Sequence, residues 1–259
     1  MSKSFLFDFE FDSIRLSQAA EQILRWTKED QHHCRYVVTP NVDHIVKLQT
    51  NKQLQAAYRH ASMILADGWP LVWASRKFGR PLPERVAGSD LPAALFEHDL
   101  TKDRHTKPTQ VFLLGAAPGI AAKASKNIQK KWGHIQVCGT YSPPLGFEKD
   151  PAENQKIIDR INLLSPDLLI LGLGAPKQEL WIKEHHQQLD VKVALCLGAT
   201  IDFMAGHKSR APRWMQKWGL EWTHRMLSEP KRLAKRYLYD AVQFPRILWR
   251  EWRKTGRPV

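Results

Sequence analysis

Cysteine is scarce in this 259-residue sequence, and it has no long hydrophobic run. The three cysteines, Cys34, Cys138 and Cys196, have no paired spacing, so we expect buried, reduced thiols of a cytoplasmic protein. No apolar run approaches the ~20 residues that a membrane-spanning helix needs. The acidic N-terminus has no basic segment followed by an apolar one, so we expect no secretory signal. These absences argue against a disulfide-stapled secreted domain and against an integral membrane protein.

Several motifs that define common enzyme classes are also missing. The sequence has no G-x-x-x-x-G-K-[ST] loop, no H-E-x-x-H or C-x-x-C pair and no G-x-S-x-G turn. Residues 115–119 have the spacing G-x-x-x-G, which fits a tight strand-to-helix turn as well as a nucleotide contact. The acidic residues 8–12 mimic a D-x-D metal clamp, but we expect them to be solvated strand positions. We therefore predict no metal site.

The charge is strongly basic and unevenly distributed. The chain has 39 Lys and Arg against 26 Asp and Glu, a net charge of +13. Residues 207–259 hold 14 of the basic and four of the acidic residues, a net +10, together with five of the ten tryptophans. Basic residues interleaved with Trp suit an anionic membrane surface or a nucleic acid. We predict a catalytic domain at 1–206 and a basic, Trp-rich helical appendage at 207–259 that associates with membranes.

Short apolar runs alternate with longer amphipathic segments as far as residue 206. The expected strands are 36–38, 63–65, 111–114, 135–137, 168–171 and 193–197. The expected helices are 42–58, 118–132, 151–164 and 176–186, with only helices after Gly206 and the last of them starting near Pro230. This alternation predicts an α/β fold with a mostly parallel, Rossmann-like sheet flanked by helices, followed by a helical C-terminal appendage.

Small or polar residues follow every expected strand. In chain order they include Thr39 and Asn41, Asp67, Gly115, Tyr141, Lys177 and Gln178, and Asp202. Ligands of a parallel α/β sheet bind outside the carboxyl ends of its strands. We therefore expect these residues to form one rim, where the N-termini of helices favour a phosphate group.

Two charged residues of this rim are candidates for chemistry. Asp67 directly follows a strand, which suits a general base, although a turn or helix-capping aspartate is an equally good interpretation. Arg85 lies among small and apolar residues and is suited to holding a diphosphate or developing negative charge. The alternative for Arg85 is a surface salt bridge with Glu84 or Asp90.

The order of the motifs resembles that of one known family. The motifs are Thr39-Pro40-Asn41, Ala66-Asp67-Gly68, Glu84-Arg85-Val86-Ala87-Gly88-Ser89-Asp90, Gly172-Leu173-Gly174-Ala175-Pro176-Lys177-Gln178-Glu179, Gly198-Ala199-Thr200-Ile201-Asp202-Phe203, Arg210-Ala211-Pro212-Arg213-Trp214, Gly219-Leu220-Glu221-Trp222 and Glu229-Pro230-Lys231-Arg232-Leu233. They resemble the WecG/TagA/CpsF glycosyltransferases, glycosyltransferase family 26, and the resemblance runs from about residue 5 to residue 236.

The resemblance implies an inverting hexosyltransferase that needs no metal or other cofactor. Its substrates would be a UDP-sugar and a polyprenyl-diphosphate-linked sugar, at the cytoplasmic face of the membrane. The product would feed a cell-surface polysaccharide such as teichoic acid, enterobacterial common antigen or exopolysaccharide. Residues 67–73 resemble the exopolysaccharide glucosyltransferase branch more than the N-acetylmannosamine branch, so the donor sugar stays open between the two.

The resemblance also implies roles for individual residues. Asp67 would be the general base, and Thr39 and Asn41 would line its pocket. Arg85 would act on the substrate beside them. The residues implied to bind substrate are Gln178, Asp202, Arg225 and Arg232, and the strand-end residues Gly115, Tyr141 and Lys177 join them as candidates. After Arg232, the next basic position is Lys235 followed by Arg236, and the sequence leaves open which of these two acts.

Two functions of other classes remain as alternatives. A nucleic-acid-binding module would use the basic appendage, but it does not explain the polar residues at all six strand ends. An NAD-dependent oxidoreductase would need a more complete glycine pattern than residues 115–119 provide. The expected partners are therefore a UDP-sugar, a lipid-linked acceptor and an anionic membrane surface, without nucleic acid, and homo-oligomerisation stays open.

Overall fold

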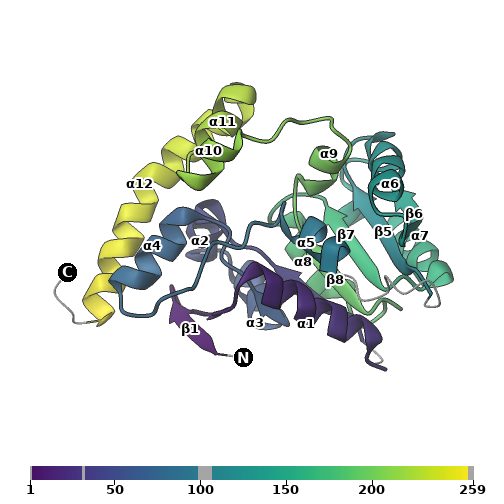
Figure 1. Cartoon of the computed structure of the whole chain (residues 1–259). Helices are drawn as coiled ribbons and strands as arrows, with labels where there is room; N and C mark the ends of the chain where they lie inside the picture. The colour runs from purple at the N-terminus through teal and green to yellow at the C-terminus, as the bar shows by residue number, and fades with distance from the viewer. Residues whose placement is uncertain (1, 31–32, 99–106, 256–259) are drawn as a thin grey trace.

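The computed structural model describes residues 2–30, 33–98 and 107–255, which form a two-stranded hairpin, a six-stranded sheet and flanking helices (Figure 1). The hairpin strands are β1 (Lys3–Leu6) and β2 (Phe9–Asp12), and the sheet strands are β3 (Arg35–Val38), β4 (Met63–Ile64), β5 (Thr109–Gly115), β6 (Ile135–Tyr141), β7 (Leu168–Gly172) and β8 (Val193–Cys196). The sheet is parallel throughout, in the order β4-β3-β8-β7-β5-β6. This confirms the predicted fold class and all six expected strands.

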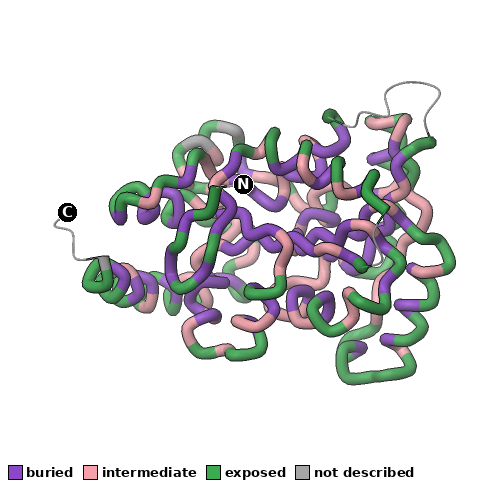
Figure 2. Tube along the Cα trace, turned by 90° about the horizontal axis from the view of Figure 1, so that it is seen from below, coloured by how far each residue is buried: buried purple, intermediate pink, exposed green. Residues whose placement is uncertain are grey.

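The helices cover both faces of the sheet, as the apolar strand runs predict. They are α1 (Leu16–Lys28), α2 (Val42–Leu48), α3 (Lys52–Arg59), α4 (Trp69–Lys77), α5 (Leu91–His98), α6 (Ile120–Lys131), α7 (Pro151–Leu164), α8 (Lys177–His185), α9 (Thr200–Met204), α10 (Arg213–Lys217), α11 (Glu221–Ser228) and α12 (Pro230–Thr255), with a 3-10 turn at Phe147–Lys149. Tyr36 and Val38 of β3 pack into one hydrophobic cluster, and Val37 packs into the other. Successive residues of a strand point to opposite faces, so the sheet separates two apolar layers. Figure 2 shows the buried residues concentrated in the interior of the molecule.

The predicted helix at 42–58 is wrong, because the segment forms two helices. α2 ends at Leu48 and α3 begins at Lys52. The side chain of Asn51 accepts a hydrogen bond from the backbone N–H of Leu54 at 2.9 Å and caps α3. Asparagine offers the backbone this local partner in place of a continuous helix, which the apolar spacing alone does not indicate.

The N-terminal hairpin corrects a second expectation. Asp8 is exposed in its turn, and Glu10 is exposed on β2, but Asp12 is buried. Asp12 accepts a hydrogen bond from the backbone N–H of Ile64 at 2.9 Å and pairs with Lys3 at 2.8 Å. The carboxylate therefore ties the hairpin to the edge strand β4 and is not solvated.

The C-terminal helices fold back onto the rest of the chain (Figure 1). α12 runs along α2, and the ring of Phe244 lies 5.9 Å from that of Phe7 in the hairpin. Lys254 pairs with Asp8 at 2.6 Å near the end of the helix. No described helix is both long and apolar enough to cross a membrane. Residues 256–259 of the expected appendage lie outside the described residues, and the division at residue 206 stays a prediction.

The three cysteines are free thiols, as expected. Cys34 and Cys196 are buried, and burial raises the pKa of both thiols above the ordinary value. Cys138 is only half-buried, which corrects the expectation of a fully buried thiol. Its position on β6 at the edge of the sheet explains the exposure.

Candidate active site

A polar cavity of about 260 Å³ opens at the carboxyl ends of β3, β7 and β8. We call it the polar cavity. Seven residues predicted from the sequence line it: Thr39, Asn41, Asp67, Gln178, Asp202, Arg225 and Arg232. Other polar side chains on its wall are Asp43, His44, Lys208 and Arg236. The structure thus brings most of the predicted residues together at the expected edge of the sheet.

A second cavity of about 400 Å³ adjoins the first. We call it the aromatic cavity, because its wall includes Trp69, Phe203, Trp222, Tyr237 and Phe244. Arg85 also lines it. Asn41, Asp43, Asp67, Arg225 and Arg236 line both cavities. Asp67 therefore lies at the junction of the two cavities.

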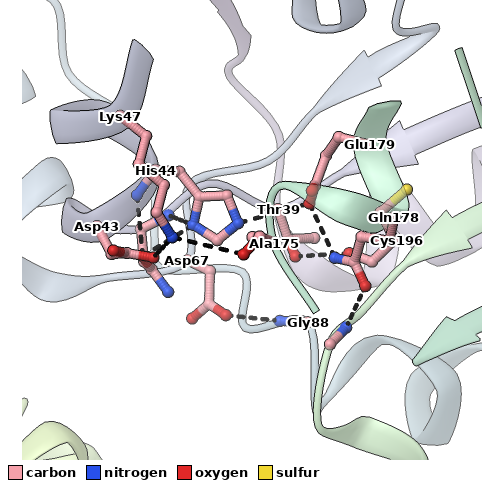
Figure 3. Close-up of polar contacts among 12 residues, drawn as sticks. Thr39, Asp43, His44, Lys47, Asp67, Gly88, Ala175, Gln178, Glu179 and Cys196 are labelled. Atoms are coloured by element: carbon pink, nitrogen blue, oxygen red, sulfur yellow. Dashed lines mark hydrogen bonds and ion pairs between the residues drawn. The ribbon is translucent and has the colours of Figure 1, made fainter. Parts of the chain in front are cut away.

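Asp67 is half-buried at this junction, three residues after Ile64, the last residue of β4. Its Oδ2 atom accepts a hydrogen bond from the backbone N–H of Gly88 at 3.1 Å (Figure 3). The N-cap of α4 is Gly68, so the interpretation of Asp67 as the cap of that helix is wrong. Its carboxylate is held by one backbone bond and keeps its other oxygen for the cavity.

The pKa of Asp67 is raised above the ordinary aspartate value. Burial is the main cause, and the charge of Glu221 adds to it. Arg85, the N–H of Gly88 and Arg225 act in the opposite direction. A carboxylate with a raised pKa accepts a proton more readily near neutral pH, which is the property that a general base needs.

Thr39 and Gln178 fix the ends of the strands around the polar cavity (Figure 3). The hydroxyl of Thr39 donates to the carbonyl of Cys196 at 3.2 Å, which links the ends of β3 and β8. The side-chain oxygen of Gln178 accepts from the backbone N–H of Gly198 at 3.1 Å, and its amide donates to Glu179 at 2.8 Å. A Cβ atom at Gly88 would lie 2.8 Å from the Thr39 hydroxyl oxygen, so glycine is required there for this close approach.

Asn41 caps α2, and the first turn of that helix supplies two site residues that the sequence reasoning missed. The Asn41 side chain accepts from the backbone N–H of His44 at 3.4 Å. His44 Nε2 lies 3.5 Å from Glu179, and Asp43 pairs with Lys47 at 2.7 Å. The available signal was their position directly after Asn41, because the first turn of a helix that begins at a strand end faces the ligand rim.

Arg85 lies behind Asp67 in the wall of the aromatic cavity. It pairs with Glu221 of α11 at 2.9 Å and lies 3.7 Å from Asp90. The alternative interpretation of Arg85 was a salt bridge with Glu84 or Asp90, and the ion pair with Asp90 confirms that part of it. Glu84 instead accepts a hydrogen bond from the backbone N–H of Leu16. Burial lowers the pKa of Arg85, but Asp67, Glu221 and Asp90 together raise it. A permanent positive charge therefore faces Asp67.

Four cationic side chains from the C-terminal segment reach the polar cavity. They are Lys208, Arg225, Arg232 and Arg236. The break between Arg225 on α11 and Arg232 on α12, which Pro230 predicts, is confirmed. Arg236 lies one turn beyond Arg232 and lines both cavities, whereas Lys235 lines neither. This cluster, together with the nearby helix N-termini, suits a phosphate or diphosphate group.

The model of the WecG/TagA/CpsF glycosyl transferase family matches residues 5–258 of this chain. The chain belongs to this family. Two similar proteins are N-acetylglucosaminyldiphosphoundecaprenol N-acetyl-beta-D-mannosaminyltransferases of Staphylococcus aureus, from strains MRSA252 and MW2. They are 30% and 29% identical over 226 residues, which is 87% of this chain and 85% of each relative. The protein is therefore a glycosyltransferase, which decides against the two alternative classes.

Three of the residues predicted for this glycosyltransferase site line neither cavity. Gly115 has a φ of +121°, and a Cβ atom there would lie 2.6 Å from the backbone of Gly172, which fits the tight-turn interpretation. The hydroxyl of Tyr141 donates to Glu153, and Lys177 pairs with Glu148 at 3.0 Å. Their roles in substrate binding stay predictions.

The acidic and histidine residues of this family member do not gather into a metal centre in the described part of the chain. There, no group of three or more His, Cys, Asp or Glu side chains is arranged to hold a metal ion. Asp43, Asp67 and Asp202 line the polar cavity together with four cations. The expectation that the transfer reaction needs no metal ion stays a prediction.

Proposed function

We propose that the protein transfers a hexose from a UDP-sugar to a polyprenyl-diphosphate-linked sugar, with inversion at the anomeric carbon. The observation that carries this proposal is the position of Asp67 at the junction of a cation-lined polar cavity and an aromatic cavity. The printed names of the Staphylococcus aureus relatives support the class of acceptor, an N-acetylglucosaminyl diphosphoundecaprenol.

In the proposed reaction, Asp67 takes the proton of an acceptor hydroxyl while the oxygen attacks the anomeric carbon. The attack comes from the side opposite the leaving UDP, so the configuration inverts. The raised pKa of Asp67 supports this role. The bond from the Gly88 N–H fixes the carboxylate in one orientation, so the reaction does not first have to order it.

The polar cavity would hold the donor nucleotide. Gln178 and Asp202 are placed to contact it, and Thr39 and Asn41 line the part next to Asp67. The departing UDP gains negative charge, which Lys208 and the arginines of α11 and α12 are placed to offset. We propose that these cations perform this task without a bound metal.

The donor sugar is proposed to be N-acetylmannosamine, because the names of the relatives specify its transfer. Glucose is the second candidate, on the strength of residues 67–73. Within this segment, Asp67 lines both cavities, so the segment reaches the place proposed for the donor sugar.

An anionic membrane surface is the proposed location of the reaction. Trp214 and Trp218 near α10 are 59% and 80% exposed, and Trp249 on α12 is 54% exposed. Exposed aromatic side chains of this size are typical of a surface that something else covers. With the +10 charge of residues 207–259, they suit the interface of an anionic leaflet.

The direct test is transfer by the purified full chain. UDP-N-acetylmannosamine or UDP-glucose is supplied with a lipid-linked N-acetylglucosamine diphosphate, and UDP release and the anomeric configuration of the product are measured. We expect one donor to give an inverted product and Asp67→Asn to abolish transfer while UDP still binds. Asp159→Asn, an exposed position on α7, is the control for the loss of one charge. Near-normal turnover of Asp67→Asn would remove Asp67 as the base, and no product from either donor would contradict the function.

A further inference from the structure

The aromatic cavity contains a carboxylate that the proposed reaction does not use. Asp240 of α12 lines this cavity and is only 4% exposed. Neither of its side-chain oxygens has a hydrogen-bond partner among the described residues. A buried polar group without a partner is costly, and in a native structure it calls for an explanation. Its position on a cavity wall indicates that the missing partner is a ligand.

The charges around Asp240 define which ligand group fits. Burial and the neighbouring Asp43 raise its pKa to about 6, whereas Arg236, Lys47 and His44 lower it. Lys47 is paired with Asp43 at 2.7 Å, and Arg236 lies 3.9 Å from the same carboxylate. Lys47 and Arg236 thus form their ion pairs with Asp43. Asp240 retains its capacity to accept a hydrogen bond. A neutral ligand group with an O–H or N–H can donate a hydrogen bond to Asp240. An anionic ligand group would instead be repelled by the carboxylates of Asp43 and Asp240.

The rest of the cavity wall fits a sugar ring. Tyr237, Asp240 and Phe244 share one face of α12, at positions i, i+3 and i+7. Trp222 lies 5.8 Å from the ring of Tyr237, edge to face. Apolar C–H faces of a pyranose pack against aromatic rings while its polar groups need a small number of placed partners. A carboxylate among aromatic rings provides both.

We propose that Asp240 selects the acceptor by accepting a hydrogen bond from a hydroxyl or acetamido N–H of its neutral sugar. The proposal rests on the proposed function, because it places the acceptor sugar in the aromatic cavity with its reacting hydroxyl at Asp67. No bond forms or breaks at Asp240. It is a specificity and positioning residue, and it lies on a different element from the general base.

The test compares two replacements of Asp240 in the full chain. Asp240→Leu has a similar size and cannot accept a hydrogen bond, so the KM for the lipid-linked acceptor should rise about tenfold or more. The KM for the UDP-sugar should stay within about twofold, because the donor occupies the other cavity. Asp240→Asn keeps an acceptor oxygen and should recover part of the loss. Neither variant should melt at a lower temperature, since both remove an unpartnered buried charge.

A binding measurement makes the result independent of turnover. The affinity for an N-acetylglucosaminyl diphosphate with a short alkyl chain is measured without donor, with Asp159→Asn as the control. Unchanged affinity and acceptor KM in Asp240→Leu would overturn the proposal. An equal rise in both KM values with a lower melting temperature would also overturn it, since that pattern indicates a structural role. Absence of transfer by the unaltered protein would contradict the proposed function alone, because the binding comparison still decides the role of Asp240.

Discussion

At the scale of single residues, the role of base that we propose for Asp67 makes two opposing demands on it. A base must be ionised at the working pH, yet it must hold a proton strongly enough to remove it from a hydroxyl. Burial raises the pKa of Asp67, and the positive charge of Arg85 is the largest influence that lowers it. Arg85 is itself paired with Glu221 at 2.9 Å. The basicity of Asp67 therefore depends on α11, which carries Glu221.

This balance predicts a shift in the pH profile of Arg85→Gln. The ionised form of Asp67 is the active one, so kcat/KM falls as the pH drops through its pKa. That pKa is already raised, and removal of Arg85 takes away the main influence that lowers it. The acidic limb of the profile should therefore move to higher pH. The measurement is kcat/KM against pH, with Arg59→Gln on the exposed surface of α3 as control. An unchanged limb, or one moved to lower pH, would show that Asp67 does not set it.

At the scale of elements, α12 is both a wall of the site and part of the hydrophobic core. Phe244 and Ile247 are buried in the larger core cluster. Glu251 is buried near the end of the helix and lies 3.3 Å from Arg80. These contacts fix α12 against the body, so the residues that face the cavities keep their positions without a ligand.

Ile247→Ala tests the importance of this packing. Ile247 lines neither cavity, so its truncation acts through the helix alone. Removal of a buried isoleucine side chain typically costs ~2–5 kcal/mol of unfolding free energy. Val242→Ala on the same helix removes a 49% exposed side chain and should change stability by ~0.5 kcal/mol or less. Urea unfolding followed by circular dichroism measures both. Equal stabilities of the two variants would mean that α12 contributes little to the fold.

The sequence predicted the elements whose signals are local. The strands from β3 to β8 are short apolar runs, and Asp150, Pro151 and Asn41 mark helix starts that the structure confirms. Thr39, Asp67 and Gln178 could be found because parallel strands end at one edge. The break at Asn51 was missed. It depends on whether the backbone N–H of Leu54 bonds to the Asn51 side chain or continues the hydrogen bonding of one long helix.

From α12, the resemblance to the family predicted Arg232 and left Lys235 and Arg236 open, but local sequence signals could not predict which residues of this helix line the site. Arg236 and Asp240 belong to a helix with charged and apolar residues on much of its surface. Which of its faces meets the cavities depends on how the whole helix docks on α2. That docking is decided by distant contacts such as Phe244 with Phe7, and no local pattern encodes it.

At the scale of the whole molecule, one end of the protein carries most of the net positive charge and much of the exposed aromatic surface. α10, α11 and α12 lie together at one end, away from β6 and α7 at the other (Figure 1). Attraction of basic residues to an anionic leaflet weakens as salt screens it. Because the basic and aromatic end also carries the helices that line the cavities, binding to a membrane would orient the protein with the cavities near the lipid surface. The proposed lipid-linked acceptor would be found there.

Vesicle binding tests this orientation. The full chain should sediment with vesicles of anionic phospholipid and less with neutral ones, and binding should weaken as salt is raised. A Trp214→Ser, Trp218→Ser double variant should bind several-fold less, because it loses two exposed aromatic side chains. Leu163→Ser removes an 84% exposed apolar residue of α7 at the other end and should bind as the unaltered chain does. Equal losses in both variants would contradict a membrane-facing end.

The contact between the first hairpin and the last helix has a consequence for biosynthesis. Strands β3, β7 and β8 emerge from the ribosome before α12, so the polar cavity, the proposed nucleotide site, has its strand framework early. Arg236, Tyr237 and Asp240 arrive with α12, which packs on α2 and places Phe244 against Phe7 of the hairpin that is made at the very start. A nascent chain that lacks α12 is thus unable to complete the wall of the aromatic cavity, so the proposed acceptor site forms only after that helix has been translated.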